Sequence, residues 1–404
     1  MRKFYFSLIL LISFTSLFAQ DSLVVETDSL SNNNLVDSLV VEKTDSSFVI
    51  SKQDSLAGMF VDSSVTFLFM GDIMGHDAQI ESAYDSIKGI YDYHSVFAHV
   101  KPIISKADFA IANLEVTLAG PPFKGYPQFS SPDVLAAACR DNGVDAFVTA
   151  NNHSCDRGKS GIIRTLNVLD SLGIEHTGTF RDPADRDTMD LLIFEKNGIR
   201  VGLLNYTYGT NGLTIPEPTI VNKIDNSTIL ADIEKSKKQN LDKLIVMVHW
   251  GLEYETDPNQ KQLAIADLLF ENGVDIIIGS HPHVLQPMAY NKGDSLSPEK
   301  LVVYSLGNYV SNQRTQPRDG GAMVEFTLTK SGDVTSVTNH GYYLTWVNKP
   351  YRNGKYYFEV VPCAEYEADN YKDMSSASVV KMKAFVENSR NLFNEGNINF
   401  KEIK

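Results

Sequence analysis

The stretch Val65-Thr-Phe-Leu-Phe-Met-Gly-Asp72 places a carboxylate directly after an apolar run that is typical of a buried strand. Four later apolar runs are likewise followed by side chains that can bind a metal ion or a substrate. These side chains are Asn113 and Glu115 after Phe109–Ala112, Asn152 and His153 after Ala146–Thr149, His249 after Leu244–Val248, and His281 and His283 after Asp275–Ile278. Because the carboxyl ends of strands in an α/β sheet border one crevice, we expect these side chains to meet there.

Amphipathic segments lie between the apolar runs and predict helices. The predicted helices are His94–Ala107, 131–143, Lys159–Leu172, Ser227–Gln239, Asn259–Glu271 and Ala377–Phe393, and further strands are predicted at Gly202–Asn205, Val302–Ser305, Met323–Thr329, Gly341–Val347 and Tyr356–Val361. The alternation of strand and helix predicts one α/β domain over residues 64–404. Its motifs lie in residues 65–325, and residues 326–404 supply C-terminal strands and a helix.

The first 63 residues differ in composition from the rest. Met1-Arg2-Lys3 precedes an apolar run and the small residue Ala19, which is the layout of a secretory signal peptide over residues 1–19. Residues 20–63, rich in Asp, Ser and Val, predict a disordered tether, with a pair of edge strands as the alternative. We therefore expect an exported protein of the periplasm or cell surface, tethered to the membrane if the signal is uncleaved.

Charge and cysteine content exclude two classes of protein. The chain has a formal net charge of −14 and no Lys/Arg cluster, so we do not expect it to bind nucleic acid. Three cysteines in 404 residues do not form a disulfide framework. Buried thiols are expected, with a Cys139–Cys155 pair as the alternative.

The five strand ends offer carboxylates and imidazoles together, which is a ligand set for a divalent cation. Each residue alone has a simpler explanation, such as a turn cap for Asp72 or loop hydrogen bonding for Asn152-His153. His281 and His283 are harder to explain in this way, because side chains two residues apart in an extended chain face the same side. A metal site is one cause that accounts for all five strand ends.

The order Gly71-Asp72, Asn113-Leu-Glu115, Asn152-His153, His249-Trp-Gly and Gly279-Ser-His-Pro-His283 resembles that of the calcineurin-like metallophosphoesterases. More narrowly, together with Tyr304-Ser-Leu-Gly-Asn308, it resembles the CapA family of poly-γ-glutamate capsule synthesis proteins. The resemblance covers residues 65–325 and implies a four-layer α/β/β/α sandwich of the metallo-dependent phosphatase type. It also implies that Asp72, Asn152, His249, His281 and His283 bind metal and that His153 acts as an acid or hydrogen-bond donor to a substrate oxygen.

Two positions depart from the pattern of the superfamily. Where the superfamily has Asp-x-His after the first strand, this chain has Met74, a poor ligand for a hard cation, and His76 follows two residues later. Glu115 takes the place of the usual bridging aspartate. We therefore expect one or two divalent ions, for which Mn, Zn and Fe all remain open.

Three further residues are candidates as additional ligands or as supports for ligands, namely Asn113, Glu253 and Asn308. Glu253 follows His249 by four residues and can orient a ligand imidazole, although a surface carboxylate is the alternative. Asn308 ends a turn that brings backbone donors to the crevice or serves only as a structural turn. Arg314 and Arg318 in the next loop are candidates to meet an anionic polymer or phosphate, or are simply exposed.

Three functions fit these features. The first is synthesis, transfer or anchoring of an anionic capsule polymer such as poly-γ-glutamate, possible partners being the polymer and a membrane-bound capsule synthesis complex. The second is a metal-dependent phosphomonoesterase or phosphodiesterase with a phosphoester substrate. The third is a non-catalytic binding protein with a degenerate metal site.

Overall fold

The computed structural model describes residues 39–44, 47–52 and 62–404. The expected signal peptide, 1–19, and most of the expected tether, 20–63, lie outside the described residues. Within the tether segment, β1 (Leu39–Thr44) and β2 (Ser47–Lys52) pair antiparallel in a sheet of their own.

Residues 62–404 belong to one compact unit built around two large sheets. The first sheet has the order β22-β19-β18-β3-β6-β7-β8, and β17 pairs with β3 off this path. Its strands are β3 (Ser63–Ile73), β6 (Phe109–Leu114), β7 (Ala146–Val148), β8 (Glu175–Thr177), β17 (Asn308–Val310), β18 (Gly320–Ser331), β19 (Val334–Asn348) and β22 (Glu359–Pro362). Strands β3, β6, β7 and β8 run parallel, so their carboxyl ends lie along one edge.

The second sheet has the order β10-β11-β13-β14-β16-β15. Its strands are β10 (Leu192–Lys196), β11 (Ile199–Thr207), β13 (Lys243–His249), β14 (Ile276–Ser280), β15 (Leu285–Asn291) and β16 (Lys300–Leu306). The four inner strands are parallel, whereas β10 and β15 are antiparallel edge strands. The inner strands are almost continuously apolar, which is the pattern of parallel strands that are covered on both faces.

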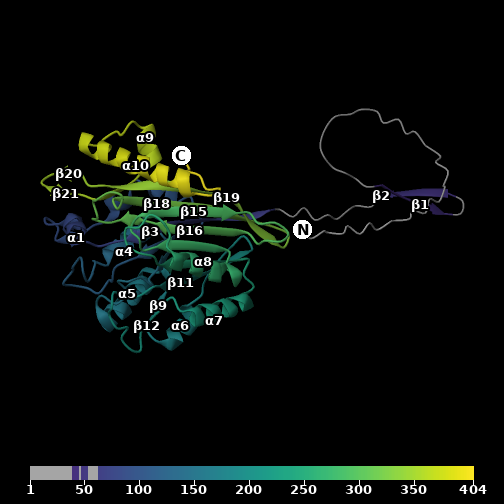
Figure 1. Cartoon of the computed structure of the whole chain (residues 1–404), viewed down its shortest axis with the longest axis horizontal. Helices are drawn as coiled ribbons and strands as arrows, with labels where there is room; N and C mark the ends of the chain where they lie inside the picture. The colour runs from purple at the N-terminus through teal and green to yellow at the C-terminus, as the bar shows by residue number, and fades with distance from the viewer. Residues whose placement is uncertain (1–38, 45–46, 53–61) are drawn as a thin grey trace, which may run out of the picture. The chain divides into compact units, whose positions relative to one another are not determined.

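The two sheets pack face to face, and helices cover their outer faces (Figure 1). Between the sheets, Phe67 and Phe69 belong to the same apolar cluster as Ile245 and Met247. On the outer face of the first sheet, Leu68 and Met70 pack with α2 (His94–Phe97), α3 (Lys101–Ile104) and α4 (Val134–Asp141). On the outer face of the second sheet, Val246 and Val248 pack with α7 (Asn226–Ser236) and α8 (Gln260–Glu271). The predicted four-layer α/β/β/α sandwich is confirmed.

The C-terminal helix α10 (Ser376–Gly396) contributes Met382, Phe385 and Phe393 to the cluster between the sheets. In Figure 1 it lies on the side of the strands opposite α7 and α8. The remaining elements are α1 (Asp77–Ala83), α5 (Gly158–Leu172), α6 (Pro183–Met189), α9 (Cys363–Ala368), the 3-10 helix η1 (Lys237–Gln239), and the short pairs β4 (Tyr84–Asp85) with β5 (Ile90–Tyr91), β9 (Thr179–Phe180) with β12 (Ile220–Val221), and β20 (Tyr351–Arg352) with β21 (Lys355–Tyr356).

One predicted helix is wrong in its extent. The chain from His94 to Ala107 forms the two short helices α2 and α3 rather than one helix, because Pro102 lacks a backbone N–H and its ring clashes with the preceding turn. The strand expected over Tyr356–Val361 is split into β21 and β22. All three cysteines are buried free thiols, as expected. Within the described residues, no helix combines the length and the apolar character that crossing a bilayer requires.

Candidate metal centre

The candidate metal centre lies at the carboxyl ends of strands from both sheets. The first sheet supplies Asp72 on β3 and Glu115 directly after β6. The second sheet supplies His249, the last residue of β13, and His281, the residue after β14. The expected crevice is therefore formed between two sheets rather than along one.

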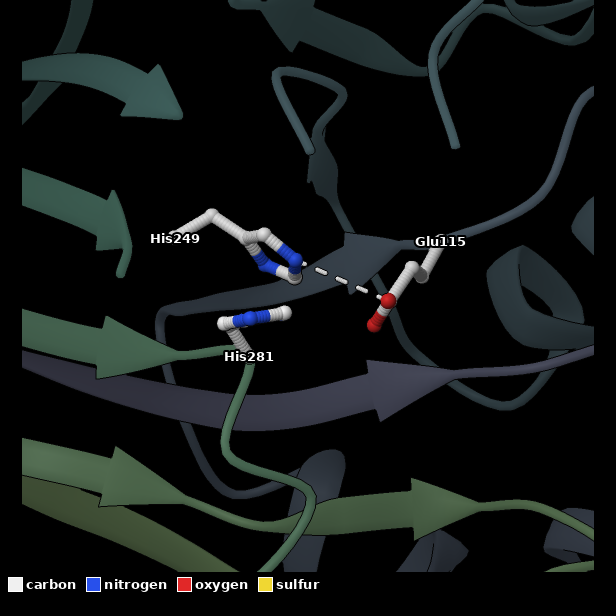
Figure 2. A group of neighbouring side chains, drawn as sticks. All are labelled: Glu115, His249 and His281. Atoms are coloured by element: carbon white, nitrogen blue, oxygen red, sulfur yellow. Dashed lines mark ion pairs between the residues drawn. The ribbon is translucent and has the colours of Figure 1, made fainter. Parts of the chain in front are cut away.

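Glu115 occupies the middle of this group. Its Oε1 atom lies 3.6 Å from Nε2 of His249 and 3.7 Å from Nε2 of His283. Figure 2 shows the Glu115 carboxylate pointing towards the His249 ring, with the His281 ring beside it. The ring centroids of His249 and His281 are 4.7 Å apart. Glu115 and His249 are both fully buried, and His281 and His283 are nearly so. The carboxylate and the imidazoles therefore face one another without bulk water.

Asp72 is held by residues of both sheets. Asn113 Nδ2 donates to Asp72 Oδ1 at 2.8 Å, and His283 Nδ1 lies 3.1 Å from Asp72 Oδ2. Gly71 precedes it, and a Cβ atom there would lie 2.0 Å from the carbonyl oxygen of Gly307. Only glycine permits this close approach, which sets Asp72 opposite Asn308 on β17. Asn113 thus orients a carboxylate ligand.

Two groups of three possible ligands share Glu115. Asp72, Glu115 and His283 form one group, and Glu115, His249 and His281 form the other, each with ligand atoms within 4.8 Å of one another. A third group consists of Glu253, His281 and His283. Glu115 is therefore shared by two of the three groups that could hold a divalent ion.

Several polar atoms in the centre are buried but make no hydrogen bond to any described residue. They are Glu115 Oε1, Asn152 Nδ2, His281 Nδ1 and Asn308 Oδ1. A buried polar atom without a partner costs roughly 1–3 kcal/mol, more when the group is charged. Carboxylate oxygens and imidazole nitrogens are donors that a divalent cation satisfies, so the residues present fit a metal ion.

The pKa shifts of these residues keep the imidazoles neutral, whereas at Glu115 a proton competes with a bound cation. Burial, with a smaller effect of Asp72, raises the pKa of Glu115 well above its usual value. Burial and the neighbouring imidazoles hold the pKa of His249 well below its usual value and lower that of His281 to about 3. Both histidines are therefore neutral at pH 7 and offer lone pairs to a metal.

His281 and His283 do not reach the centre in the way that the sequence pattern suggested. They lie after β14 in irregular chain, with positive φ angles of 100° and 57°. Their ring centroids are nonetheless 6.0 Å apart, so both imidazoles reach the same centre. Non-glycine residues in this backbone region cost about 1–3 kcal/mol each, and such residues cluster at functional sites.

His153 is paired with Asp156. Its Nδ1 atom lies 2.7 Å from Asp156 Oδ2, and both side chains are buried. The same Asp156 oxygen accepts a hydrogen bond from the backbone N–H of Phe129, whose ring meets the His153 ring edge to face at 4.6 Å. Sequence reasoning did not assign a role to Asp156, although its spacing of three residues from His153 is a signal for such a pair.

Met74 and His76 take other roles than that of the missing ligand. Met74 is buried in the apolar cluster on the outer face of the first sheet. His76 precedes α1, and its Nδ1 atom lies 3.0 Å from Gln79 Oε1. His76 is in none of the three ligand groups found among the described residues.

The remaining candidates surround the ligands. Asn152 Oδ1 lies 3.0 Å from His249 Nε2, so Asn152 is part of the centre. Asn308 Nδ2 donates to the carbonyl oxygens of His283 and Arg318 and fixes the chain after β14. Glu253 is exposed and lies beside His281 and His283 rather than beside His249.

A cleft of about 930 Å³ opens beside the centre, with His281 in its wall. Tyr208, Trp250 and Leu252 give it an apolar lining, and Glu253 and Lys261 carry its charges. The Tyr208 ring lies 4.5 Å from the His281 ring. A substrate bound in this cleft would lie against His281 of the metal centre.

The sequence matches known proteins over the region that contains the centre. A family model described as "Bacterial capsule synthesis protein PGA_cap" matches residues 66–313. The capsule biosynthesis protein CapA of Bacillus anthracis is 29% identical over 66% of this chain and 65% of its own length. The PGA biosynthesis protein CapA of Bacillus subtilis (strain 168) is 30% identical over 70% of this chain and 73% of its own length.

The chain thus spans 65% of the Bacillus anthracis protein. Among solved structures, the calcineurin-like phosphoesterase YfkN from Bacillus subtilis aligns with 82% of this chain and 98% of that chain, with a TM-score of 0.43 and 15% identity.

Proposed function

Because the chain belongs to the PGA_cap family of bacterial capsule synthesis proteins, we propose that it is an exported, metal-dependent enzyme of capsule polymer synthesis, transfer or anchoring. The proposed polymer is anionic, such as poly-γ-glutamate, and the proposed partner is a membrane-bound capsule synthesis complex. The observation that carries the proposal is the buried Glu115 carboxylate shared by two groups of metal ligands.

Asp72, Glu115, Asn152, His249, His281 and His283 would hold the ion or ions. A divalent cation bound there would polarise a phosphoryl or carbonyl oxygen of the substrate. The burial of Glu115 and His249 excludes water from around the ligands, which strengthens electrostatic interactions at the centre. Manganese, zinc and iron ions all accept this mixture of carboxylate and imidazole ligands.

His153 would move the proton. Asp156 accepts from Nδ1 of His153, which leaves Nε2 as the atom that gives a proton to a leaving group or takes one from a nucleophile. His153 directly follows Asn152, whose Oδ1 atom lies 3.0 Å from Nε2 of the ligand His249, so His153 lies beside the ligands. Asp156 serves as a positioning residue that fixes the tautomer and the orientation of the ring.

Metal content is the first test. The purified chain is incubated with manganese, zinc or iron ions, separated from free metal and analysed by elemental analysis. We expect retained metal in the wild type and in the control Glu387→Gln, an exposed position on α10, and loss of most of it in Glu115→Gln. A wild-type protein that retains no metal would overturn both catalytic functions.

The second candidate function is hydrolysis of phosphate esters, and the buried His153–Asp156 pair beside the acid–imidazole cluster favours it. Assays of the metal-loaded chain on nitrophenyl phosphate esters and on poly-γ-glutamate, the latter followed by the appearance of new chain ends, distinguish the two functions. In whichever assay is positive, His153→Ala should lower the rate about 10²- to 10⁴-fold. Replacement of the exposed His94 should leave the rate unchanged. Metal binding without either activity would favour a non-catalytic binding protein.

A further inference from the structure

A second cavity, of about 610 Å³, lies away from the ligands of the metal centre. Its walls come from the end of β19, the β20–β21 hairpin, the first turn of α10 and the loop that carries Arg314. We call it the basic pocket, because Arg314, Lys349, Arg352 and Lys381 line it and the one acidic residue in its lining is Asp373. The whole chain, by contrast, has a formal net charge of −14.

Three of these four cations form no direct ion pair within the described residues, although the charge of the buried Asp319 acts on Arg314 and Lys381. Arg352 forms an ion pair with Glu359, but Arg314, Lys349 and Lys381 form none. Burial, and next the charge of Arg314, lower the pKa of Lys349, and burial lowers that of Arg314. Arg314 and Lys349 therefore repel each other, and an anion bound between them would relieve this repulsion.

Arg314 is also placed for recognition. Its guanidinium lies 5.4 Å from the centre of the Trp346 ring, and its Nη1 atom is buried without a hydrogen-bond acceptor in the described residues. A stacked guanidinium with an unused donor is suited to a carboxylate or phosphate oxygen. The amino-terminal turn of the 21-residue helix α10 adds partial positive charge to the same pocket.

The loop that carries Arg314 also contacts the metal centre. Gln313 Oε1 accepts a hydrogen bond from Asn308 Nδ2 at 3.0 Å, and Asn312 Oδ1 accepts one from Lys349 Nζ at 2.8 Å. Arg318 of the same loop lies over the Tyr254 ring at 4.4 Å. One short loop thus joins a candidate catalytic centre to the basic pocket.

We propose that the basic pocket is a second binding site, which takes carboxylate groups of an acidic polymer chain whose other part reaches the metal centre. The identity of the polymer rests on the proposed function, whereas the preference for anions rests on the pocket alone. Trp346, Tyr351 and Tyr356 give the pocket aromatic surface for the methylene groups between carboxylates. A γ-linked glutamate chain repeats both chemical features along its length.

The test is calorimetric titration of the full chain, stripped of metal, with a γ-linked glutamate oligomer, with its uncharged amide counterpart and with inorganic phosphate. Lys381→Glu alters an exposed lining residue, and Lys383→Glu makes the same change on the same helix outside the lining. Each substitution takes the formal net charge from −14 to −16, since one positive charge becomes one negative charge. Arg314→Gln is the second lining variant.

We expect the oligomer to bind, with an affinity that falls as salt rises, and the uncharged amide not to bind. Lys381→Glu should weaken binding about tenfold or more and Lys383→Glu less than about threefold. Equal loss in the two lysine variants, or unchanged binding in both Lys381→Glu and Arg314→Gln, would overturn the proposal. Binding of phosphate without the oligomer would overturn the carboxylate assignment.

Metal removal separates this proposal from the proposed function. Oligomer binding that persists without metal and depends on Lys381 supports the basic pocket even if the centre binds no metal. Oligomer binding that requires metal and ignores Lys381 leaves the proposed function intact and overturns the pocket.

Discussion

The two ends of strand β13 differ in how the fold neutralises their acidic side chains. At its first residue, Lys243 Nζ lies 3.1 Å from Asp275 Oδ1 and 3.1 Å from Glu299 Oε2. At its last residue, His249 faces Glu115, whose Oε1 atom makes no hydrogen bond within the described residues. The chain supplies a cation for its carboxylates at one end and only neutral imidazoles at the other.

The acids at the first end have further partners. The backbone N–H of Leu244 donates to Asp275 at 2.8 Å, and the Tyr290 hydroxyl donates to Glu299 at 2.8 Å. Burial lowers the pKa of Lys243, but Asp275 and Glu299 outweigh it and the net shift is upward. The comparison teaches that a cluster of acidic side chains does not by itself indicate a metal centre. The indication is a fully buried acid, such as Glu115, for which the fold supplies no cation.

The largest effect is expected when the paired end loses its cation. Lys243→Met leaves Asp275 and Glu299, whose side chains are 27% and 11% exposed, without their shared positive charge and should lower the free energy of unfolding by about 3 kcal/mol, the low end for a buried pair. Urea unfolding at pH 7 measures this loss, with Lys238→Met, an exposed lysine of η1, as the control. A loss below about 1 kcal/mol would mean that the cluster is not a closed ion network.

Addition of a divalent ion should act at the other end and approach the same size. An ion that binds only the folded state stabilises it by about 2.7 kcal/mol at one hundred times its dissociation constant. Glu115→Gln and His281→Ala should each abolish most of this gain, because each removes a ligand from two of the three groups.

Addition of a divalent ion should raise the free energy of unfolding of Lys243→Met by the same amount as that of the wild type. The two ends of the seven-residue strand lie about 20 Å apart at the usual rise per residue, and effects at that distance add. Thermal unfolding at several metal concentrations measures it. Metal stabilisation that depends on Lys243 would break the distinction between the two ends.

A single chemical change should have opposite signs at the two ends. Without metal, Glu115→Gln removes a buried carboxylate that lacks a cation and should stabilise the fold by about 1 kcal/mol. Glu299→Gln removes a carboxylate that Lys243 needs and should destabilise it by about 1–3 kcal/mol. Excess metal should reverse the effect at Glu115 and leave that at Glu299 unchanged. Urea unfolding of both variants with and without metal tests all four values.

The sequence predicted the positions of these residues better than their arrangement. An apolar run followed by a polar side chain marks the carboxyl end of a buried strand, and this local signal placed Asp72, Glu115 and His249. It did not reveal that two sheets share the centre, because the contact of β3 with β14 and β16 across the sandwich is not a local property. Nor did it reveal the positive φ angles of His281 and His283, which the surrounding fold imposes on non-glycine residues.

The opposite strand ends carry a similar signal that went unused. Lys243 begins β13, Asp275 directly precedes β14, and Glu299 directly precedes β16. Charged residues that flank neighbouring parallel strands are candidates for an ion cluster, just as those after the strands are candidates for a metal centre. What the sequence cannot supply is the balance of charges after pairing, which distinguishes the two ends.

The smallest effect on the free energy of unfolding is expected at an exposed cluster of paired charges. His94 lies 3.0 Å from Asp141 and 2.7 Å from Asp92, and 53% of its side chain is exposed. Hydrogen bonds to Asp141 and then Asp92 raise the pKa of His94 above its usual value of 6.5. The folded state therefore binds the proton more tightly, so the resulting stability is complete below pH 6.5 and is lost as the pH rises through the higher folded value.

Solvent screens such a pair, and its contribution should not exceed about 0.5 kcal/mol. His94→Gln should accordingly remove a small fall in unfolding free energy between pH 6 and pH 8 and change nothing at higher pH. Urea unfolding at several pH values compares the variant with the wild type. A fall in unfolding free energy as large as the loss in Lys243→Met would contradict this expectation. It would show that the number of charged partners, rather than their burial, sets the size of these effects.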